Sequence, residues 1–323
     1  SKYLGSDFQV SATVGHIKDL PQNQIGVNVE KGFQPSYRLI RGKNKVVERL
    51  RQAAGGVDAI YLTSDPDREG EAIAWHVAQE IAKGKSKEEL PKFYRVLLHE
   101  ITHSGVKKAL DGAGALDKRR YESQLARRIL DRLVGYELSP LLWRKVSGGL
   151  SAGRVQSVAV ALVVDREREI QGFDAHEYWV VRAQLSSTQP PEFSARLVRI
   201  GDDKAEVGSE EQVKPLIENL RKATYNISKV VRDEKKRYAL PPYITSTLQQ
   251  DAHRLYRFSA KKTMSIAQRL YEGVDMAGAG THGLITYMRT DSLRVSNDAL
   301  SSARGFIEGN YGQEYLPPKP NFY

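Results

Sequence analysis

The sequence of 323 residues contains no cysteine. This absence excludes disulfides, cysteine-ligated zinc, iron–sulfur clusters and thiol nucleophiles, and it agrees with a reducing cytoplasm. There is also no run of about 18 apolar residues, so we predict no membrane-spanning helix. The first residues do not have the layout of a signal peptide. A G-x-x-x-x-G-K-S/T loop is lacking, because the glycine-rich segment 148–154 has a different spacing, and we therefore expect no ATP hydrolysis on a P-loop.

Basic residues outnumber acidic ones. Lys and Arg number 49 against 39 Asp and Glu, which gives a formal net charge of +10. This excess indicates a polyanionic partner, with nucleic acid first and an anionic membrane second. Apolar residues make up 40% of the chain, enough for real cores, and the length predicts about two domains.

The first third of the chain alternates strand and helix signals. This alternation over residues 1–115 predicts an α/β domain with a mainly parallel sheet. The expected strands cover 9–14, 57–64 and 94–98, and the expected helices cover 43–53 and 71–82.

Helical and strand patterns alternate in larger blocks after that point. Residues 116–172 are predicted to be helical, with a first helix ending near Gly135 and a second over 155–170. Residues 177–240 return to short strands, and from Thr245 the pattern is helical again. The short strands are expected over 178–181, 193–200 and 225–231, with a helix over 210–222 and a glycine-rich loop over 278–283. Four blocks exceed what the length predicts, so we expect some of them to be halves of domains that the chain leaves and re-enters.

An acidic loop follows the strand predicted over 57–64. Asp65, Asp67 and Glu69 are spaced at i, i+2 and i+4, and the loop then opens a helix. Ligand sites in α/β sheets lie at the carboxyl ends of strands, and clustered carboxylate oxygens suit Mg²⁺. The alternative is a solvated turn whose acids stabilise the start of the helix.

A second pattern, His99-Glu100-Ile101-Thr102-His103, matches the H-E-x-x-H spacing of zinc proteases. That chemistry needs both histidines on one face of a helix. Here the motif follows a predicted strand directly and no third ligand is evident. We therefore favour a turn at the end of a strand with ordinary histidines.

Residues 118–154 form a basic helical block. Nine Lys or Arg stand against three acids, a local charge of +6 in 37 residues, and Tyr136 and Trp143 are interspersed among them. Cations for phosphates combined with aromatic rings for bases are typical of a single-strand groove. Asp131 is spaced to hold both Arg127 and Arg128, or to form a plain intrahelical ion pair.

The end of this block, residues 151–156, opens the next helix with small residues. These would let a phosphate approach backbone N–H groups, with the Arg154 guanidinium on the same phosphate. The alternative is an ordinary N-cap at Ser151.

Residues 283–292 form the most informative segment. Tyr287 and Arg289 are two apart, so on an extended chain they share a side. A tyrosine beside an arginine can attack a phosphodiester, because the cation favours the phenolate and neutralises the pentacoordinate phosphorus. The alternative is a half-buried tyrosine beside a structural arginine.

These motifs together resemble those of bacterial type IA DNA topoisomerases, in particular the topoisomerase I branch. The resemblance covers nearly the whole chain, and the motifs occur in the family's order. The segments that carry it are 65–71, 151–156 and 283–292, supported by 14–21, 99–102 and 244–250.

The resemblance implies a multidomain α/β and α+β fold. The implied parts are a Toprim α/β domain over 1–115, the first part of a helical DNA-binding domain over 116–172, the first part of a β-rich arch over 173–241, and an incomplete helical gate domain over 242–323 that carries the nucleophilic tyrosine.

The resemblance further implies the roles of single residues. Tyr287 would be the nucleophile that forms a 5′-phosphotyrosine link, with Arg289 assisting at the phosphate. Asp65 would ligate Mg²⁺, with Asp67 and Glu69 completing the acidic catalytic site. By the same matching, the residues that contact or order DNA would be His16, Arg127, Arg128, Asp131, Tyr136, Trp143, Ser151, Ala152, Gly153, Arg154, Val155 and Gln156.

The implied activity is relaxation of negatively supercoiled DNA without ATP, by a cytoplasmic, nucleoid-associated monomer that cleaves a single-stranded segment. Met288 and segment 14–21 favour this over a topoisomerase III-like decatenase. The residues are also compatible with a Toprim nuclease or primase-like polymerase, and with a basic nucleic-acid-binding module that has no activity.

The chain also departs from the family pattern. It begins after the family's first strand, which has a segment like V-I-V-E-S-P-A-K, and the link Pro21–Gly26 is short. It ends soon after the tyrosine segment. We therefore expect the chain of 323 residues to be inactive or nearly so in relaxing plasmid DNA.

Overall fold

The computed structural model describes residues 3–187, 190–276, 280–321 and 323. The chain folds into two compact units. The first unit comprises Ser1–Arg154 and Ala239–Tyr323, and the second comprises Val155–Tyr238. The chain therefore leaves the first unit and returns to it, as the sequence blocks indicate.

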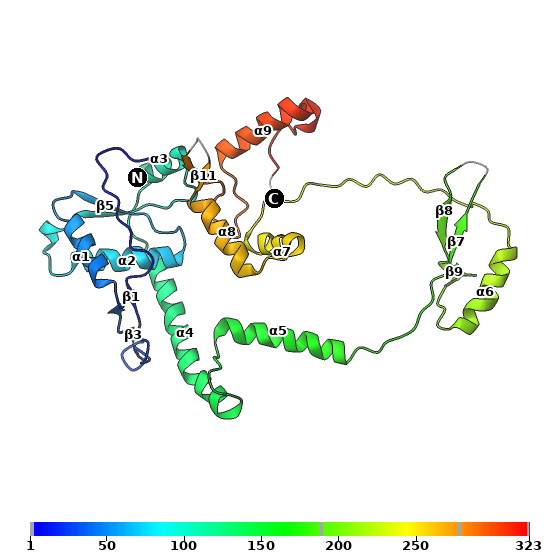
Figure 1. Ribbon diagram of the computed structural model, residues 1–323, viewed down its shortest axis with the longest axis horizontal. Helices are drawn as coiled ribbons and strands as arrows, with labels where there is room; N and C mark the ends of the chain where they lie inside the picture. Colours follow the sequence, from blue (N-terminus) through cyan, green and yellow to red (C-terminus); the bar gives the residue numbers. More distant parts are fainter. Residues whose placement is uncertain (1–2, 188–189, 277–279, 322) are drawn as a thin grey trace. The chain divides into compact units, whose positions relative to one another are not determined.

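The amino-terminal part of the first unit is an α/β structure (Figure 1). Strands β5 and β6 pair in parallel, with Ala59 opposite Lys92 and Leu62 opposite Arg95. Helices α1 and α2 pack against each other beside them. The elements of this part are β1 (Lys18–Asp19), β2 (Val27–Asn28), β3 (Gln34–Pro35), β4 (Arg38–Leu39), α1 (Asn44–Ala53), β5 (Ala59–Leu62), α2 (Arg68–Ala82), the 3₁₀ turn η1 (Lys87–Glu89), β6 (Lys92–Arg95) and α3 (His103–Asp111).

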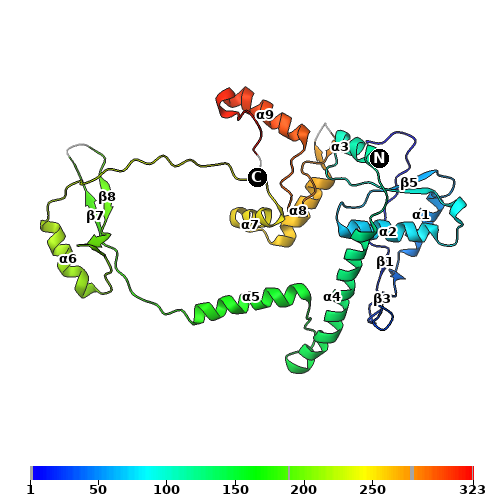
Figure 2. The ribbon, with the colours of Figure 1, turned by 180° about the vertical axis from the view of Figure 1, so that it is seen from behind.

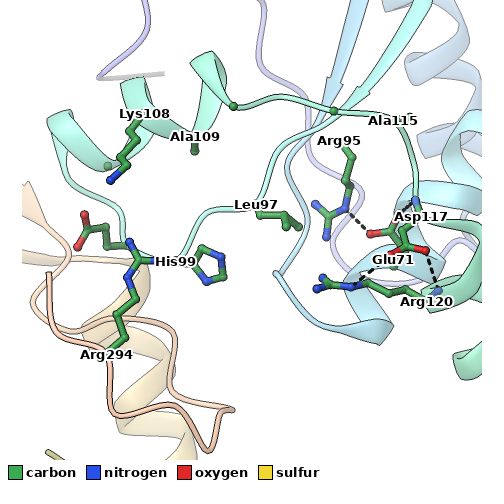
Figure 3. Close-up of a pocket in the computed structure, with 14 residues that line it drawn as sticks. Glu71, Arg95, Leu97, His99, Lys108, Ala109, Ala115, Asp117, Arg120 and Arg294 are labelled. Atoms are coloured by element: carbon green, nitrogen blue, oxygen red, sulfur yellow. Dashed lines mark hydrogen bonds and ion pairs between the residues drawn. The ribbon is translucent and has the colours of Figure 1, made fainter. Parts of the chain in front are cut away.

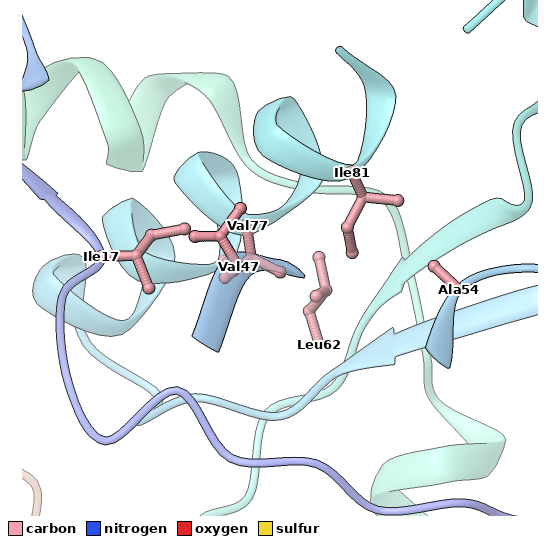
Figure 4. Close-up of a cluster of buried hydrophobic side chains, with 7 residues drawn as sticks. Ile17, Val47, Ala54, Leu62, Val77 and Ile81 are labelled. Atoms are coloured by element: carbon pink, nitrogen blue, oxygen red, sulfur yellow. The ribbon is translucent and has the colours of Figure 1, made fainter. Parts of the chain in front are cut away.

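Apolar side chains from these elements form the larger core (Figure 4). Ile17 is fully buried, and Val77 and Ile81 from α2 meet Val47 from α1 and Leu62 from β5. Burying an aliphatic side chain of this size contributes about 1.5–3 kcal/mol. The core therefore fixes the end of β5 against α2, the two elements that the acidic loop joins.

The strand predicted over 9–14 is wrong. These residues have no regular structure, and their carbonyl oxygens are bound by side chains instead of a neighbouring strand. Lys43 Nζ donates to the oxygens of Thr13 and Val14, and Arg49 donates to that of Ala12. The helices predicted over 43–53 and 71–82 are confirmed, although α2 begins three residues earlier, at Arg68.

A long helix, α4 (Lys118–Lys145), follows and packs on α2. The prediction that it ends near Gly135 is wrong, because it continues through Gly135 and Pro140. A Cβ at Gly135 would lie 3.9 Å from the oxygen of Ala152. Segment 151–153 therefore passes beside the helix at this point, at an ordinary contact distance.

The carboxyl-terminal part of the first unit is mostly helical. Helices α7 and α8 lie side by side in both views (Figure 1, Figure 2). A second core joins Tyr271 of α8 to Tyr287 and Met288. The elements are α7 (Thr245–Tyr256), α8 (Ala260–Glu272), β11 (Val274–Met276), β12 (Gly280–His282), α9 (Asn297–Tyr311) and the 3₁₀ turn η2 (Gln313–Tyr315). The predicted loop over 278–283 is partly the strand β12, and Gly278 lies outside the described residues.

The second unit contains α5 (Arg154–Gln171, of which Arg154 belongs to the first unit), two antiparallel strand pairs and one helix. The helices predicted over 155–170 and 210–222 are confirmed. Strands are confirmed within 193–200, whereas 178–181 and 225–231 form none. The other elements are β7 (Arg182–Leu185), β8 (Phe193–Arg196), β9 (Arg199–Ile200), β10 (Asp203–Lys204) and α6 (Glu210–Lys222). In the part of the chain that the structure describes, no helix has the length and apolar character needed to cross a bilayer.

Candidate active site

The acidic loop joins the end of β5 to the start of α2. Asp67 is the N-cap of α2, and its Oδ1 accepts a hydrogen bond from the backbone N of Gly70 at 2.8 Å. Ser64 Oγ donates to the oxygen of Gly70 at 2.5 Å. The helix-capping interpretation is thus correct for Asp67, and capping does not use its second carboxylate oxygen.

Arg95, at the end of β6, holds this loop in place. Its guanidinium donates to the backbone oxygens of Ser64 at 2.8 Å and Asp65 at 2.6 Å, and to Glu71 Oε2 at 2.8 Å. Arg95 and Glu71 are both buried. A buried ion pair is stable only when its remaining donors and acceptors are satisfied, and here the backbone of the loop satisfies them. Sequence reasoning missed Arg95, because only the folded chain brings it to the loop 30 residues earlier.

Tyr287 lies against the acidic loop. Its hydroxyl donates to Asp67 Oδ2 at 2.5 Å, across 220 residues of sequence. Its backbone N donates to the oxygen of His99 at 2.8 Å, and its ring meets the edge of Tyr271 with centroids 5.4 Å apart. Only 5% of Tyr287 is exposed. The tyrosine segment and the acidic loop, predicted separately from sequence, therefore meet at one point.

The electrostatics of Tyr287 differ from the expectation that a neighbouring cation favours the phenolate. Burial raises the pKa of the Tyr287 phenol, and the hydrogen bond to Asp67 raises it further. Arg289 acts in the opposite direction and does not outweigh them. In this arrangement the phenol is neutral and its proton is directed at a carboxylate.

The carboxylates of the acidic loop suit a hard cation such as Mg²⁺ only in part. Burial raises the pKa of the Asp65 carboxyl, and the neighbouring charge of Asp67 raises it further. A cation bound between the two would relieve this repulsion, and Mg²⁺ is commonly held by one or two carboxylates with water completing its shell. Across the described ranges, however, no three His, Asp or Glu side chains converge as a metal site would. The set of Asp65, Asp67 and Glu69 therefore stays a prediction, and the first two fit it best.

Glu69 is directed toward other partners. Its Oε2 lies 3.1 Å from His16 Nε2 and 3.2 Å from Gln124 Nε2. The hydrogen bond to His16 lowers the pKa of the Glu69 carboxyl below its ordinary value of 4.5. His16, for which the resemblance implies a role in contacting or ordering DNA, thus lies beside the acidic loop.

This pair predicts a pH dependence. A carboxyl whose folded-state pKa is depressed contributes stability that is present above its unfolded pKa and is lost as pH falls through the folded pKa. His16→Ala should bring the pKa of Glu69 back toward 4.5 and so reduce the loss of stability below about pH 4.5. Thermal unfolding of both proteins from pH 6 to pH 3 measures this.

The matched control is His176→Ala, because the His176 side chain is 83% exposed and its Nε2 lies 3.5 Å from Asp174 Oδ2, a carboxylate that is 84% exposed. That variant should follow the unsubstituted protein at every pH. If the stability of His16→Ala and that of the unsubstituted chain fall in the same way as the pH is lowered, the His16–Glu69 pair does not contribute to the pH dependence of stability.

A groove of about 780 Å³ opens beside the acidic loop. Five arginines and three acids line it, so it attracts polyanions. Among the predicted residues, Asp67, Glu69, Arg127 and Arg289 lie in this groove. Residues without a predicted role complete it: Pro66, Arg68, Arg119, Arg120, Ser123, Gln124 and Asp291. A signal existed for Arg120 and Gln124, because positions 120 and 124 share one face of a helix with the predicted Arg127.

Three residues predicted to contact or order DNA, Arg128, Asp131 and Arg154, are paired within the chain. Asp131 does not hold Arg127 and Arg128, and that interpretation is wrong. Asp131 accepts from Arg154 Nε at 2.7 Å, and Arg128 forms a forked pair with Asp19 at 2.6 and 2.7 Å. Bidentate geometry makes these strong pairs, so they fix α4 to Asp19 and to Arg154.

The remaining predicted DNA residues lie along α4 and the turn that follows it. Tyr136 donates to the oxygen of Gln22 and lies under the Arg132 guanidinium, 5.1 Å from its ring. Trp143 donates to the oxygen of Leu150 at 2.6 Å with half its surface exposed. Ala152 donates its backbone N to Ser139 Oγ at 3.1 Å. Ser151 and Gly153 flank it, and Val155 and Gln156 follow Arg154 in the first turn of α5.

The H-E-x-x-H spacing does not form a zinc site. Helix α3 begins only at His103, with Thr102 as its N-cap, so His99 lies before the helix and the two histidines do not share a face. The interpretation as a turn at a strand end is therefore supported.

Comparison with known proteins gives a consistent result. The family model described as Toprim domain matches residues 1–101, and the model described as DNA topoisomerase matches residues 115–323. DNA topoisomerase 1 of Rickettsia felis and that of Rickettsia typhi are each 46% identical over 327 residues, covering all of this chain and 42% of each relative. The structure of full-length topoisomerase I from Thermotoga maritima has 40% identity and a TM-score of 0.78, covering 97% of this chain and 51% of that one. The chain thus spans about half the length of these relatives or less.

Proposed function

This chain belongs to the bacterial type IA DNA topoisomerase family, and from that premise we propose that Tyr287 cleaves single-stranded DNA by transesterification. The observation that supports this is the 2.5 Å hydrogen bond from the Tyr287 hydroxyl to Asp67 Oδ2. A nucleophile must lie within reach of the groups that manage its proton and the charge on the phosphate. The acidic loop and the arginine-lined groove supply both at this tyrosine.

The proposed step exchanges one ester for another. The phenolic oxygen of Tyr287 forms a bond to phosphorus, the bond from phosphorus to the 3′-oxygen breaks, and the strand stays attached as a 5′-phosphotyrosine. The leaving 3′-oxygen takes up a proton from solvent and becomes a 3′-hydroxyl. Asp67 Oδ2 accepts the phenolic proton along the existing hydrogen bond. Arg289 lines the same groove and neutralises charge that develops on the phosphate. The new ester keeps the energy of the old one, so religation needs no ATP.

Toprim domains typically bind Mg²⁺, and we propose Asp65 and Asp67, with Glu69, as its ligands here. When bound, the ion neutralises negative charge on the phosphate. We also propose that His16, Arg127 and Trp143 contact the strand, while Arg128, Asp131 and Arg154 order the groove wall.

The wider function is proposed on the same basis. The whole protein relaxes negatively supercoiled DNA as a monomer in the cytoplasm, at the nucleoid. The domain limits proposed are 1–115 for the Toprim domain, 116–172 for the helical domain, 173–241 for the arch and 242–323 for the gate.

The direct test is attachment of DNA to the chain. Single-stranded DNA labelled at its 3′ end is incubated with the chain, with Mg²⁺ or with EDTA, and the reaction is stopped with denaturant. We expect a labelled adduct that maps to the peptide containing Tyr287, because attachment requires one chemical step and not strand passage. We expect EDTA to reduce strand cleavage more than DNA binding.

Two results would favour a different function. Cleavage without a protein–DNA adduct would identify a nuclease and contradict the proposal. Salt-sensitive binding with neither cleavage nor a response to Mg²⁺ would identify a binding module.

A further inference from the structure

A second cavity, of about 400 Å³, is lined partly by residues to which the proposed cleavage gives no role (Figure 3). Its wall combines α3, the segment before α3, and Arg294, seven residues after Tyr287. Its volume falls in the range of cavities that hold small organic ligands. Arg120 lines both this cavity and the groove.

One side of the cavity is apolar and built from small residues. Leu97, Ala109 and Ala115 contribute side chains, and Gly114 contributes backbone. A Cβ added at Gly114 would meet no atom within 4 Å, so the space there is open. A wall of this kind accommodates a flat ring, because no long side chain projects into it.

The other side carries positive charge. Figure 3 shows Arg294 approaching His99 from one element, Lys108 descending from α3, and Arg120 entering from the opposite side. Within the described part of the chain, the side chains of Arg294 and Lys108 make no hydrogen bond or ion pair. Burial lowers the pKa of the His99 imidazole, and Arg294 and Arg120 lower it further, so it adds no charge of its own near neutrality.

The acids of the cavity only partly offset these cations. Glu71 is bound by Arg95 and by the backbone N of Asp117. Asp117 accepts from the backbone of Arg119 and Arg120 as the N-cap of α4, and its Oδ2 lies 3.6 Å from Arg120 Nε. Glu100 alone adds an acid that is not bound in this way. An anionic group at Arg294 and Lys108 would therefore be favoured.

We propose that this cavity is a binding site for a nucleoside monophosphate, with the phosphate at Arg294 and Lys108 and the base against the wall formed by Leu97 and Ala109. The inference rests on the proposed function only in taking the ligand from the nucleic-acid class. The nucleotide is either free or one residue of a DNA strand that leaves the groove past Arg120.

The test is equilibrium dialysis of the chain against tritiated deoxyadenosine monophosphate. We expect saturable binding of one nucleotide. Unlabelled nucleotide should compete better than deoxyadenosine or inorganic phosphate. Arg294→Ala should weaken binding at least about tenfold, because it removes a charged hydrogen-bond donor. Ala109→Leu should do the same by filling the apolar wall.

The matched control is Arg41→Ala, which removes the same charge from an exposed position outside the cavity. It should bind as the unsubstituted chain does. Absence of saturable binding, binding unchanged in both cavity variants, or equal competition by inorganic phosphate would overturn the proposal.

Saturating single-stranded oligonucleotide distinguishes the two sources. If the oligonucleotide displaces the nucleotide, and if Arg294→Ala weakens that displacement, the natural ligand is one residue of the DNA strand. If the oligonucleotide leaves nucleotide binding unchanged, the natural ligand is a free nucleotide. Either result supports the site. Adduct formation at Tyr287 is measured separately from nucleotide binding. A failure of the cleavage proposal therefore leaves the dialysis result interpretable, and a failure of nucleotide binding leaves the adduct result interpretable.

Discussion

Replacing Tyr287 with phenylalanine is expected to abolish denaturant-resistant protein–DNA adducts while leaving the fold intact. The substitution removes only the hydroxyl that donates to Asp67. The ring keeps its edge contact with Tyr271 and its buried position. Loss of the nucleophile itself should lower adduct formation at least about a thousandfold, whereas loss of one hydrogen bond should change the free energy of unfolding by about 1–2 kcal/mol. Gel quantification of adducts and urea unfolding measure the two effects.

Tyr271→Phe is the matched control. Tyr271 is equally buried, it lies in the same aromatic pair, and its hydroxyl donates to the backbone oxygen of Leu98 at 2.5 Å. This variant should lose about 1 kcal/mol of stability and keep adduct formation within about threefold. Adducts that persist in Tyr287→Phe would rule out this nucleophile. An equal loss in both variants would show that packing of the pair, and not the Tyr287 hydroxyl, limits the reaction.

Local signals determined which elements could be predicted from sequence. Helix α6 has the predicted limits, because Ser209 caps it, Glu210 and Glu211 begin it, and Arg221 and Lys222 end it. The strand predicted over 9–14 failed because side chains of α1 and its N-cap bind its carbonyl oxygens. That contact depends on residues about 30 positions away, which a local pattern does not contain.

The same distinction applies to the site. The spacing of Asp65, Asp67 and Glu69 and the Tyr287–Arg289 pair could be found in sequence, because each is local. That the two motifs lie together could be expected only from the resemblance to a family, because Tyr287 and Asp67 are 220 residues apart in the sequence. The partner of Asp131 was wrongly predicted for the same reason. Arg154 reaches it only because the chain turns after α4, whereas Arg127 and Arg128 are its neighbours on the helix.

Gly70→Ala is expected to disable the site through the backbone. A Cβ at position 70 would lie 1.9 Å from the backbone oxygen of Asp65 and 2.7 Å from its carbonyl carbon. These are main-chain atoms, held by the Arg95 guanidinium, so they cannot turn aside as a side chain could. The loop must move, which breaks the Asp67 cap on the backbone N of Gly70 and displaces Asp67 from Tyr287. We expect a loss of about 3 kcal/mol in the free energy of unfolding, at the upper end for overpacking, and loss of adduct formation.

Gly305→Ala provides the comparison for this effect. Gly305 lies inside α9, and a Cβ there would meet no atom within 4 Å. Alanine is the better helix former, so this variant should gain up to about 1 kcal/mol in urea unfolding and form adducts normally. Both variants replace glycine with alanine, but we expect Gly70→Ala to lower the free energy of unfolding and Gly305→Ala to raise it. The reason is that the backbone of Asp65 lies against position 70, whereas no atom lies within 4 Å of a Cβ at position 305. If Gly70→Ala unfolds at the same urea concentration as the unsubstituted chain and still forms adducts, the close approach of Asp65 to α2 is not what positions the acidic loop.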